Sequence, residues 1–309
     1  MNIIYYAAGA NPEVWLNAFH RYLPDARIRI WEEGDTAPAD YALVWKPPAA
    51  MLRGRTDLKA IFNLGAGVDA ILQLGDNLPQ GVPLIRVDDA GMGVQMAEYV
   101  SHAVLRHFRR FDEYDALQAD KQWRPLPPHR KEDFSIGILG LGVLGNCIID
   151  GLRSFGFPLL GWSRSAKQIE GVQCFHGDDG LDAFLRQTNV LVLILPLTKE
   201  TENLMDKAKL AKLKQGAYIV NVARGAHIVE DDLLALIQQG HISGATLDVF
   251  REEPLPPTHP FWYEKRIHIT PHISALTVRE ESAKQIAHKI AALQRGEAVV
   301  GVVDQSKGY

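Results

Sequence analysis

Apolar residues in the first 90 positions come in short runs separated by turns or helical stretches. Each run is the length of a strand, and a helical or turn segment follows it. Strands that alternate with helices in this way indicate a parallel sheet with helices on its faces. The predicted strands are Ile3–Tyr6, Arg27–Trp31, Tyr41–Trp45, Ala60–Leu64 and Leu84–Val87.

A second series of the same kind begins near Phe134. Its third run, Val190–Leu195, is continuously apolar, as expected of a central parallel strand that is buried on both faces. The predicted strands are Ile136–Leu139, Leu159–Trp162, Val190–Leu195, Ala217–Val222, Ala245–Val249 and Ile267–Thr270. The pattern therefore predicts an α/β protein with two doubly wound parallel sheets.

Two longer segments have helical spacing of their apolar residues. Gln95–Phe111 is long enough to bridge two domains, and the proline-rich stretch Trp123–Pro128 after it is predicted to be a loop. Val278–Gln294 follows the last strand of the second series, and we assign it back to the first domain. The predicted domains are then 1–95 with 276–309, and 96–275.

A glycine motif, Gly140-Leu141-Gly142-Val143-Leu144-Gly145, lies between the strand Ile136–Leu139 and an apolar helical pattern that ends near Gly156. Strand, G-x-G-x-x-G and helix together are the dinucleotide fingerprint. The first glycine permits the turn, the second lets the backbone approach a pyrophosphate, and the third packs the helix against the strand. We interpret 96–275 as a Rossmann domain, whereas a bare glycine-rich turn would be the plainer alternative.

The next strand, Leu159–Trp162, ends in Ser163-Arg164-Ser165. A domain that binds NAD carries an Asp or Glu here, about 20 residues past the glycines, for the ribose 2′-hydroxyl. This sequence has Ser163 and Arg164 instead, followed by Lys167. A hydroxyl and cations can bind a 2′-phosphate that a carboxylate would repel, so we predict NADPH, with NADH bound more weakly. A solvated basic turn is the alternative.

Composition narrows the class of protein. The chain has 309 residues, 47% hydrophobic and 23% charged, which is ordinary for a globular protein of two domains. A formal net charge of −4 argues against nucleic acid as a partner. We expect no membrane segment and no signal peptide, and the two cysteines imply no disulfide framework. These features predict a cytoplasmic protein, and the histidines have no recognised metal-ligand spacing.

Three polar residues follow predicted strands of the second series. Arg224, Glu253 and His272 come shortly after Ala217–Val222, Ala245–Val249 and Ile267–Thr270, respectively. Ligands of open α/β sheets bind at the carboxyl ends of the strands, so the three side chains can converge there. A guanidinium can engage the carboxylate and ketone of a 2-oxo acid, and a histidine backed by a carboxylate can donate a proton.

The segments around these residues resemble the signatures of the D-isomer-specific 2-hydroxyacid dehydrogenase family, in its glyoxylate/hydroxypyruvate reductase A branch. They are Asn221–Gly225, Asp248–Pro254 and Pro271–Ser274, and the resemblance extends over the whole chain. Val44–Pro48, Gly91–Gly93 and the closing Gly308-Tyr309 are similar to the branch as well. The resemblance implies NADPH-dependent reduction of glyoxylate and hydroxypyruvate, with Arg224 binding substrate, His272 as acid/base and Glu253 as its partner.

The resemblance also implies roles for flanking residues. The fingerprint, Ser163, Arg164 and Lys167 would contact the cofactor, and Asp248 resembles a residue near the nicotinamide carboxamide. Further cofactor contacts are implied for Leu195, Pro196, Thr201, Val222 and Ala223. The substrate carboxylate would meet backbone amides in Leu64–Asp69, at Ala66 and Gly67, with Trp45 narrowing the pocket. The resemblance further implies that residues 1–95 with 276–309 form a flavodoxin-like domain that binds the substrate.

Alternatives remain open on the sequence alone. Another member of the family, of D-lactate or phosphoglycerate dehydrogenase type, would share these motifs. A non-enzymatic NADP(H)-sensing binding protein of the same fold is a candidate from a different class. The family is usually dimeric, so we expect a homodimer, with the Gln95–Phe111 helix as its candidate interface.

Overall fold

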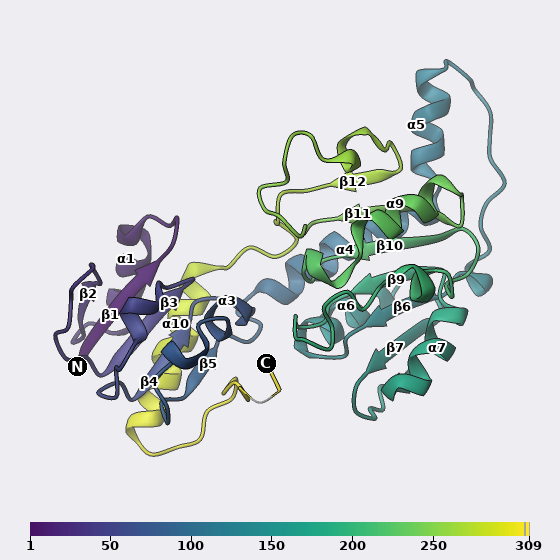
Figure 1. Ribbon diagram of the computed structural model, residues 1–309. Coiled ribbons are helices and arrows are strands. Elements are labelled where there is room, and N and C mark those ends of the chain that lie inside the picture. Colours follow the sequence, from purple (N-terminus) through teal and green to yellow (C-terminus); the bar gives the residue numbers. More distant parts are fainter. Residues whose placement is uncertain (306, 309) are drawn as a thin grey trace. The chain divides into compact units, whose positions relative to one another are not determined.

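The computed structural model describes residues 1–305 and 307–308, so Tyr309 of the closing Gly308-Tyr309 pair lies outside the described residues. The chain forms two compact units, Met1–Met92 with Thr277–Tyr309 and Gly93–Leu276 (Figure 1). The ranges predicted from sequence, 1–95 with 276–309 and 96–275, differ from these by a few residues. The first boundary between the units falls inside a helix, where the composition of the chain does not change.

The first unit is built on a five-stranded parallel sheet in the order β2-β1-β3-β4-β5. This is the flavodoxin-like order, so the predicted class of the unit is confirmed. Its strands are β1 (Asn2–Ala7), β2 (Arg27–Ile30), β3 (Tyr41–Trp45), β4 (Ala60–Asn63) and β5 (Leu84–Arg86). Its helices are α1 (Pro12–Tyr22), α2 (Ala49–Leu52), α3 (Asp69–Leu72), α10 (Arg279–Gln294) and the 3₁₀ turn η1 (Gly75–Asn77).

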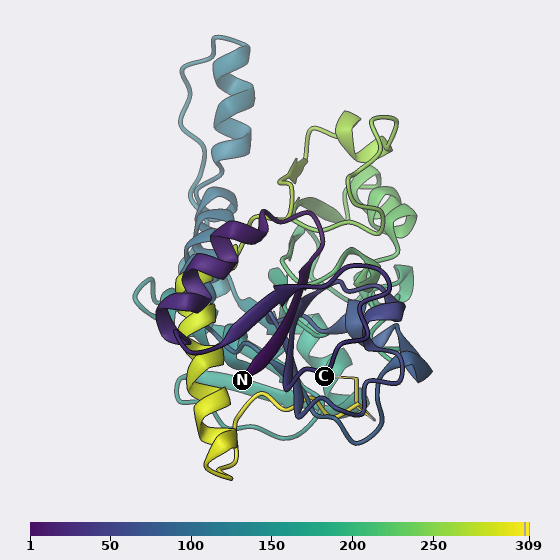
Figure 2. The ribbon, with the colours of Figure 1, turned by 90° about the vertical axis from the view of Figure 1, so that its left-hand side faces the viewer.

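The helix predicted at Val278–Gln294 is α10, and it joins the first unit. Figure 2 shows α10 beside α1, and Arg21 of α1 donates to Glu280 of α10 over 2.6 Å. Further along α10, the buried ammonium of Lys289 lies 2.8 Å from Asp88, just after β5. The C-terminal segment then returns to β5 through the Ile85–Val302 bridge. These contacts complete the discontinuous unit.

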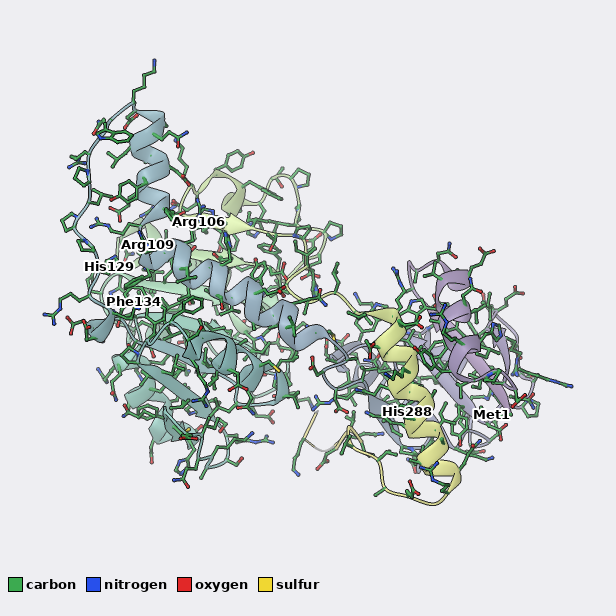
Figure 3. The ribbon with its side chains drawn as sticks, turned by 180° about the vertical axis from the view of Figure 1, so that it is seen from behind. Met1, Arg106, Arg109, His129, Phe134 and His288 are labelled. Atoms are coloured by element: carbon green, nitrogen blue, oxygen red, sulfur yellow. The ribbon has the colours of Figure 1, made fainter. Side chains whose placement is uncertain are left out.

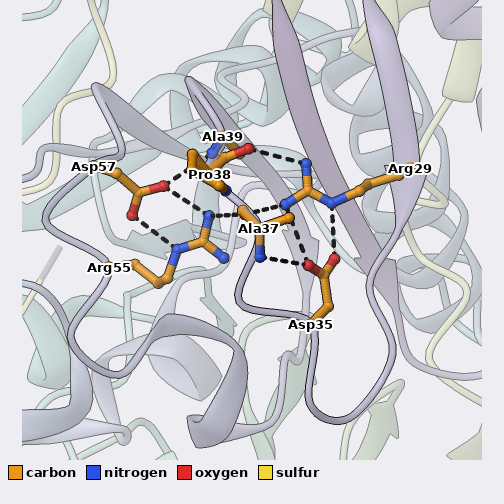
Figure 4. A network of polar contacts seen from close by, with 7 residues as sticks. All are labelled: Arg29, Asp35, Ala37, Pro38, Ala39, Arg55 and Asp57. Atoms are coloured by element: carbon orange, nitrogen blue, oxygen red, sulfur yellow. Dashed lines mark hydrogen bonds and ion pairs between the residues drawn. The ribbon is translucent and has the colours of Figure 1, made fainter.

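A network of two arginines holds the loop between β2 and β3 (Figure 4). Arg29 Nε donates to Asp35 over 2.8 Å, and Arg55 donates to both oxygens of Asp57 over 2.8 Å. Asp57 in turn accepts from the amide of Ala39. Burial alone would raise the pKa of Asp35, but its bond with Arg29 is the larger influence and lowers it. The network therefore stabilises the loop structure of this unit.

The second unit contains a seven-stranded parallel sheet in the order β12-β11-β10-β9-β6-β7-β8. Counted from β6, the order reverses between β6 and β9, as in the Rossmann fold. The predicted fold class is therefore confirmed for this unit too. The strands are β6 (Ile136–Leu139), β7 (Leu159–Ser163), β8 (Val172–His176), β9 (Val190–Leu193), β10 (Ala217–Asn221), β11 (Ile242–Leu247) and β12 (Ile267–Ile269).

Two apolar layers cover the faces of this sheet. One contains side chains of α7 (Gly177–Gln187), α8 (Lys207–Leu210) and α9 (Glu230–Gln238). The other contains side chains of α4 (Met92–Phe108) and α6 (Val143–Arg153). Short 3₁₀ turns complete the unit at η2 (Lys131–Asp133), η3 (Gly225–His227) and η4 (Pro260–Tyr263). No helix of the described residues is long and apolar enough to cross a membrane.

Two sequence predictions in this unit need correction. The strand β8 was not predicted, because its residues at the edge of the sheet are only partly buried. The helix predicted at Gln95–Phe111 is also wrong at its end: α4 ends at Phe108, Arg110 adopts a left-handed φ of 59°, and α5 (Phe111–Ala119) begins as a separate helix. In Figure 1, α5 projects from its unit. Figure 3 shows His129 and Phe134 beside the last turn of α4.

Candidate active site

The glycine turn has the geometry that a bound dinucleotide requires. Gly140 has a φ of +126°, and a Cβ there would lie 2.7 Å from the carbonyl oxygen of Ile194. A Cβ at Gly145 would lie 2.0 Å from the carbonyl oxygen of Gly140, so only glycine lets α6 start so close to the strand. At Gly142 a Cβ would meet no atom within 4 Å. The turn is thus closed on the protein side and open where a pyrophosphate would approach.

The start of α6 strengthens this interpretation. Gly142 is the N-cap residue and supplies no side-chain cap, and Val143 is half exposed. The first N–H groups of a helix have no partner within the helix, and they attract anions. Lys167 donates to the carbonyl oxygen of Leu141 in the same turn, which places its ammonium there. The residues present fit a dinucleotide, as predicted.

The residues predicted to contact a 2′-phosphate differ in their surroundings. Arg164 is exposed, directly after β7. Ser163 is buried, and its hydroxyl donates to the carbonyl oxygen of Ser165 over 2.8 Å. A phosphate oxygen needs a donor, so the Ser163 hydroxyl would have to leave Ser165 to bind one. The two cations, Arg164 and Lys167, are therefore the stronger candidates.

The loop after β9 is closed by Thr201. Its hydroxyl donates to the carbonyl oxygen of Pro196 over 2.7 Å and accepts from the amide of Thr198 over 2.8 Å. Leu195 is partly buried, and Pro196 is exposed beside it. This gives the predicted cofactor-flanking loop a defined shape at the carboxyl end of the sheet.

Arg224 lies at the end of β10, after the buried Val222 and Ala223. Asn221 accepts from the amide of Ala223 over 3.1 Å and donates to the carbonyl oxygen of Arg224 over 3.0 Å. The guanidinium donates to the carbonyl oxygen of Ala223 over 2.7 Å. The side chain of Asn221 therefore fixes the turn from which Arg224 projects.

Gly225 brings two of the strand-end loops together. A Cβ at this position would lie 1.9 Å from the carbonyl carbon of Phe250 and 2.3 Å from the amide nitrogen of Arg251. The backbone after β11 thus rests directly on the backbone after β10. Any side chain at 225 would force apart the segments that carry Arg224 and Glu253.

Glu253 and His272 form a hydrogen-bonded pair. Nδ1 of His272 lies 2.8 Å from Oε2 of Glu253, while Oε1 accepts from the amide of Phe250 over 3.0 Å. An ionised carboxylate only accepts, so Nδ1 carries the proton of this bond and Nε2 is left for exchange with a ligand. The histidine has a left-handed φ of 57°, a conformation that non-glycine residues adopt rarely and mostly at functional sites.

The charge around Glu253 shows that the three predicted catalytic residues converge. Burial alone would raise the pKa of Glu253. The hydrogen bonds from His272 and Phe250 and the charges of His272 and Arg224 outweigh burial, and the pKa lies below its usual value. The lowered pKa favours the ionised carboxylate of Glu253.

Asp248, predicted to lie near a nicotinamide, is fully buried in a network of its own. Its carboxylate accepts from the Thr270 hydroxyl over 2.6 Å and from the amides of Ile273 and Ser274 over 2.8 Å. Its carbonyl oxygen accepts from the amide of His272 over 2.9 Å. In this structure Asp248 holds the segment that carries His272, and a cofactor contact stays a prediction.

The predicted substrate turn of the first unit is also built by a side chain. Asn63, buried at the end of β4, donates to the carbonyl oxygens of Gly65 and Gly67 over 2.8 and 2.7 Å. No described residue accepts a hydrogen bond from the amides of Ala66 or Gly67. A Cβ at Gly65 would lie 2.7 Å from the ring of Trp45, so glycine lets that ring pack on the turn.

Two residues in these loops were missed by the sequence interpretation. Asn63 shapes the first-unit turn, and the fully buried His227 contacts the backbone of Arg224. The sequence analysis assigned His227 no role at the site. No group of three or more His, Cys, Asp or Glu residues in the described part of the chain is arranged to hold a metal ion.

Comparison with known proteins identifies the family. Residues 101–274 match the family described as D-isomer specific 2-hydroxyacid dehydrogenase, NAD binding domain. The chain belongs to this family. It is an oxidoreductase with the Rossmann sheet, the glycine turn and the Arg224, Glu253 and His272 motifs described above.

Its relatives in this family are similar over their full lengths. The chain is 52% identical to the glyoxylate/hydroxypyruvate reductase A of Serratia proteamaculans over 313 residues, which is 100% of each chain. A dehydrogenase of the family from Xanthobacter autotrophicus, solved with NADPH and MES, has a TM-score of 0.94 at 39% identity and covers 100% of this chain and 99% of that one. The NADPH-dependent glyoxylate/hydroxypyruvate reductase of Sinorhizobium meliloti, solved with NADP and sulfate, has a TM-score of 0.93 at 36% identity. The match covers 100% of this chain and 99% of that one.

Proposed function

We propose that this protein reduces glyoxylate to glycolate and hydroxypyruvate to D-glycerate with NADPH. The observation that carries the proposal is the Glu253–His272 pair, held near Arg224 at the carboxyl edge of a Rossmann sheet. Full-length similarity to glyoxylate/hydroxypyruvate reductase A from two bacteria supports the substrate class, at 52% and 50% identity.

NADPH fits the glycine turn, because the turn is open at Gly142 and closed at Gly140 and Gly145. When bound, NADPH supplies a hydride to the carbonyl carbon of the substrate. The start of α6 would bind the pyrophosphate, and Arg164 with Lys167 would bind the 2′-phosphate. The other residues proposed to contact it are Val143, Leu144, Ser163, Leu195, Pro196, Thr201, Val222, Ala223 and Asp248.

The chain's own residues account for the rest of the reduction. Arg224 binds the substrate carboxylate and its carbonyl oxygen with the two arms of a planar guanidinium, which orients the carbon that is reduced. As negative charge develops on the oxygen, Nε2 of His272 donates a proton to it. Glu253 keeps the imidazole in the productive tautomer and stabilises its protonated form.

Within the first unit, we propose that the turn at Ala66 and Gly67 recognises a carboxylate. The amides of Ala66 and Gly67 are free of protein acceptors among the described residues and can donate to a carboxylate. The ring of Trp45, packed on the same turn at Gly65, would favour small substrates.

We also propose that the protein is a cytoplasmic homodimer. Both cysteines are thiols, which suits a reducing compartment. Large apolar side chains on and beside the α4–α5 segment are exposed, with Val94 at 64%, Phe111 at 46% and Trp123 at 102%. Exposed apolar groups of this kind mark candidate interfaces. Light scattering tests the dimer, and a mass of one chain would contradict it.

Turnover tests the proposed reaction. The protein, NADPH and either glyoxylate or hydroxypyruvate are mixed, and oxidation of the reduced nicotinamide is followed by absorbance. Reduction of both 2-oxo acids, with pyruvate and phosphohydroxypyruvate slower, supports the proposal. Preference for pyruvate or phosphohydroxypyruvate would indicate a D-lactate or phosphoglycerate type. NADPH binding without turnover of any 2-oxo acid would indicate a binding protein.

A further inference from the structure

His227 is a fully buried histidine that contacts two of the loops at the proposed site. Its Nδ1 lies 3.2 Å from the amide nitrogen and 2.9 Å from the carbonyl oxygen of Arg224. Its Nε2 lies 3.2 Å from the carbonyl oxygen of Pro196. One imidazole ring therefore joins the backbone of the proposed substrate-binding arginine to the loop after β9.

The partners of the ring determine its hydrogen bonds. A carbonyl oxygen only accepts, so Nε2–H donates to Pro196. Nδ1 faces both backbone groups of Arg224: unprotonated, it accepts from the N–H over 3.2 Å, and protonated, it donates to the carbonyl oxygen over 2.9 Å. Pro196 is itself held, because its carbonyl oxygen also accepts from the Thr201 hydroxyl over 2.7 Å. The ring is thus anchored at one end and holds the backbone of Arg224 at the other.

Neighbouring backbone groups hold both His227 and Arg224 in place. The amide of Met205 donates to the carbonyl oxygen of His227 over 2.9 Å, so the residue is fixed from behind as well. Asn221 holds the carbonyl of Arg224 from the strand side. The N–H of Arg224, by contrast, has His227 as its acceptor. Loss of the ring would remove these contacts from the half-buried Arg224 and loosen the backbone that carries the guanidinium.

We propose that His227 is a positioning residue for substrate binding: it fixes the backbone of Arg224 relative to the Pro196 loop, so that the guanidinium meets the carboxylate of a 2-oxo acid. The inference rests on the proposed function, because it assigns the substrate carboxylate to Arg224. It predicts that changes at His227 weaken binding of the oxo acid and leave binding of NADPH nearly unchanged.

Three substitutions distinguish the contact of the ring with Arg224 from its contact with Pro196. His227→Phe keeps a ring but removes both hydrogen bonds. His227→Asn places an amide near the position of Nδ1 and can keep the bond to Arg224, whereas His227→Gln places its amide near Nε2 and can keep only the bond to Pro196. His241→Phe is the matched control, since His241 precedes β11 at the opposite edge of the sheet, where it contacts Gln215.

The measurements are KM and kcat for glyoxylate, the dissociation constant of oxalate in the presence of NADPH, the dissociation constant of NADPH, and the melting temperature. We expect His227→Phe to raise KM for glyoxylate and to weaken oxalate binding about tenfold, because a lost hydrogen bond changes an equilibrium constant by up to about this factor. NADPH binding should stay within about threefold of the parent. His227→Asn should recover most of the oxalate affinity, and His227→Gln should not. His241→Phe should retain the parent KM.

Two results would overturn the proposal. A lower melting temperature in His227→Phe with an unchanged KM and oxalate affinity would leave the ring with a purely structural role. Recovery of oxalate affinity by Gln but not by Asn would place its role at Pro196 rather than at Arg224. Because oxalate binding needs no turnover, a parent protein that reduces no oxo acid would contradict the proposed function while this comparison still tests His227.

Discussion

Nδ1 of His272 and Oε2 of Glu253 lie 2.8 Å apart, although the two residues are 19 positions apart in the chain. The bond is made possible by β11 and β12, neighbouring parallel strands whose carboxyl ends bring the two loops together. Its effect is visible at Glu253, where the contact with His272 helps to hold the pKa of the carboxyl below its usual value against the opposing effect of burial. The carboxylate of Glu253 thus lies directly against the ring that is proposed to donate the proton.

Glu253→Gln should therefore shift the pH dependence of reduction. The variant can keep a hydrogen bond to the ring but lacks the negative charge that favours its protonated form. His272 must be protonated to donate, so the rate should begin to fall at a lower pH than in the parent. Initial rates of glyoxylate reduction across the alkaline range measure this. A profile that superimposes on the parent or moves upward would refute the pairing.

The same carboxyl predicts a stability effect in acid. Because the pKa of Glu253 is lower in the folded protein than its usual value, its ionised form stabilises the fold above that usual value, and the contribution disappears as pH falls through the lowered pKa. The parent should therefore lose stability relative to Glu253→Gln as the pH falls, in denaturant unfolding at several pH values. A difference independent of pH would contradict the assignment.

Gly225→Ala should disable the site without touching a catalytic side chain. Its Cβ would lie 1.9 Å from the carbonyl carbon of Phe250, and this neighbour is backbone that cannot rotate away. We expect a loss of stability of about 1–3 kcal/mol or more and a large fall in kcat/KM. Gly180→Ala, in α7, is the control, because its Cβ would meet its nearest neighbour at an ordinary 3.5 Å. Equal behaviour of the two variants would show that the two loops are not packed as described.

The fold was predictable from the sequence where burial was extreme. Val190–Leu193 is buried on both faces and was found as a continuous apolar run, whereas the edge strand Val172–His176 has a mixed pattern and was missed. The end of α4 was also misplaced, because the apolar spacing continues through Phe111 while Arg110 leaves the helical conformation. The spacing of apolar residues does not show where the backbone leaves the helical conformation.

The site was predictable where function depends on residue type at a strand end. Arg224, Glu253 and His272 follow β10, β11 and β12, so the topology alone brings them to one edge. The role of His227 was not predictable, because it depends on a contact with Pro196, a residue 31 positions away in another loop. The hydrogen bond from the Ser163 hydroxyl to the carbonyl oxygen of Ser165 was likewise not predictable from the sequence.

Arg224→Lys should impair binding of the oxo acid. Lysine keeps the positive charge but lacks the planar fork that engages a carboxylate and a carbonyl oxygen together. We expect KM for glyoxylate to rise about tenfold or more, with kcat lowered as well, in steady-state assays at saturating NADPH. Near-normal kinetics would instead assign carboxylate recognition to the amides of Ala66 and Gly67.

Arg164→Ala should change the choice of cofactor. The exposed guanidinium directly after β7 is proposed to bind a 2′-phosphate, and a charge-assisted contact of this kind contributes about 1.5–3 kcal/mol. NADPH binding should weaken about tenfold or more while NADH binding stays nearly constant, as measured by titration of nicotinamide fluorescence. Equal weakening of both cofactors would show that Arg164 does not recognise the phosphate.

The proton donor is the centre of this account, and His272→Ala tests it most directly. Removal of a general acid costs on the order of 10²–10⁴ in rate, so kcat for glyoxylate reduction should fall within that range while the dissociation constant of NADPH stays at the parent value. Both quantities are measured on the same protein sample, the first by turnover and the second by fluorescence titration. A variant that binds NADPH normally and reduces glyoxylate at the parent rate would contradict the assignment of the proton to His272.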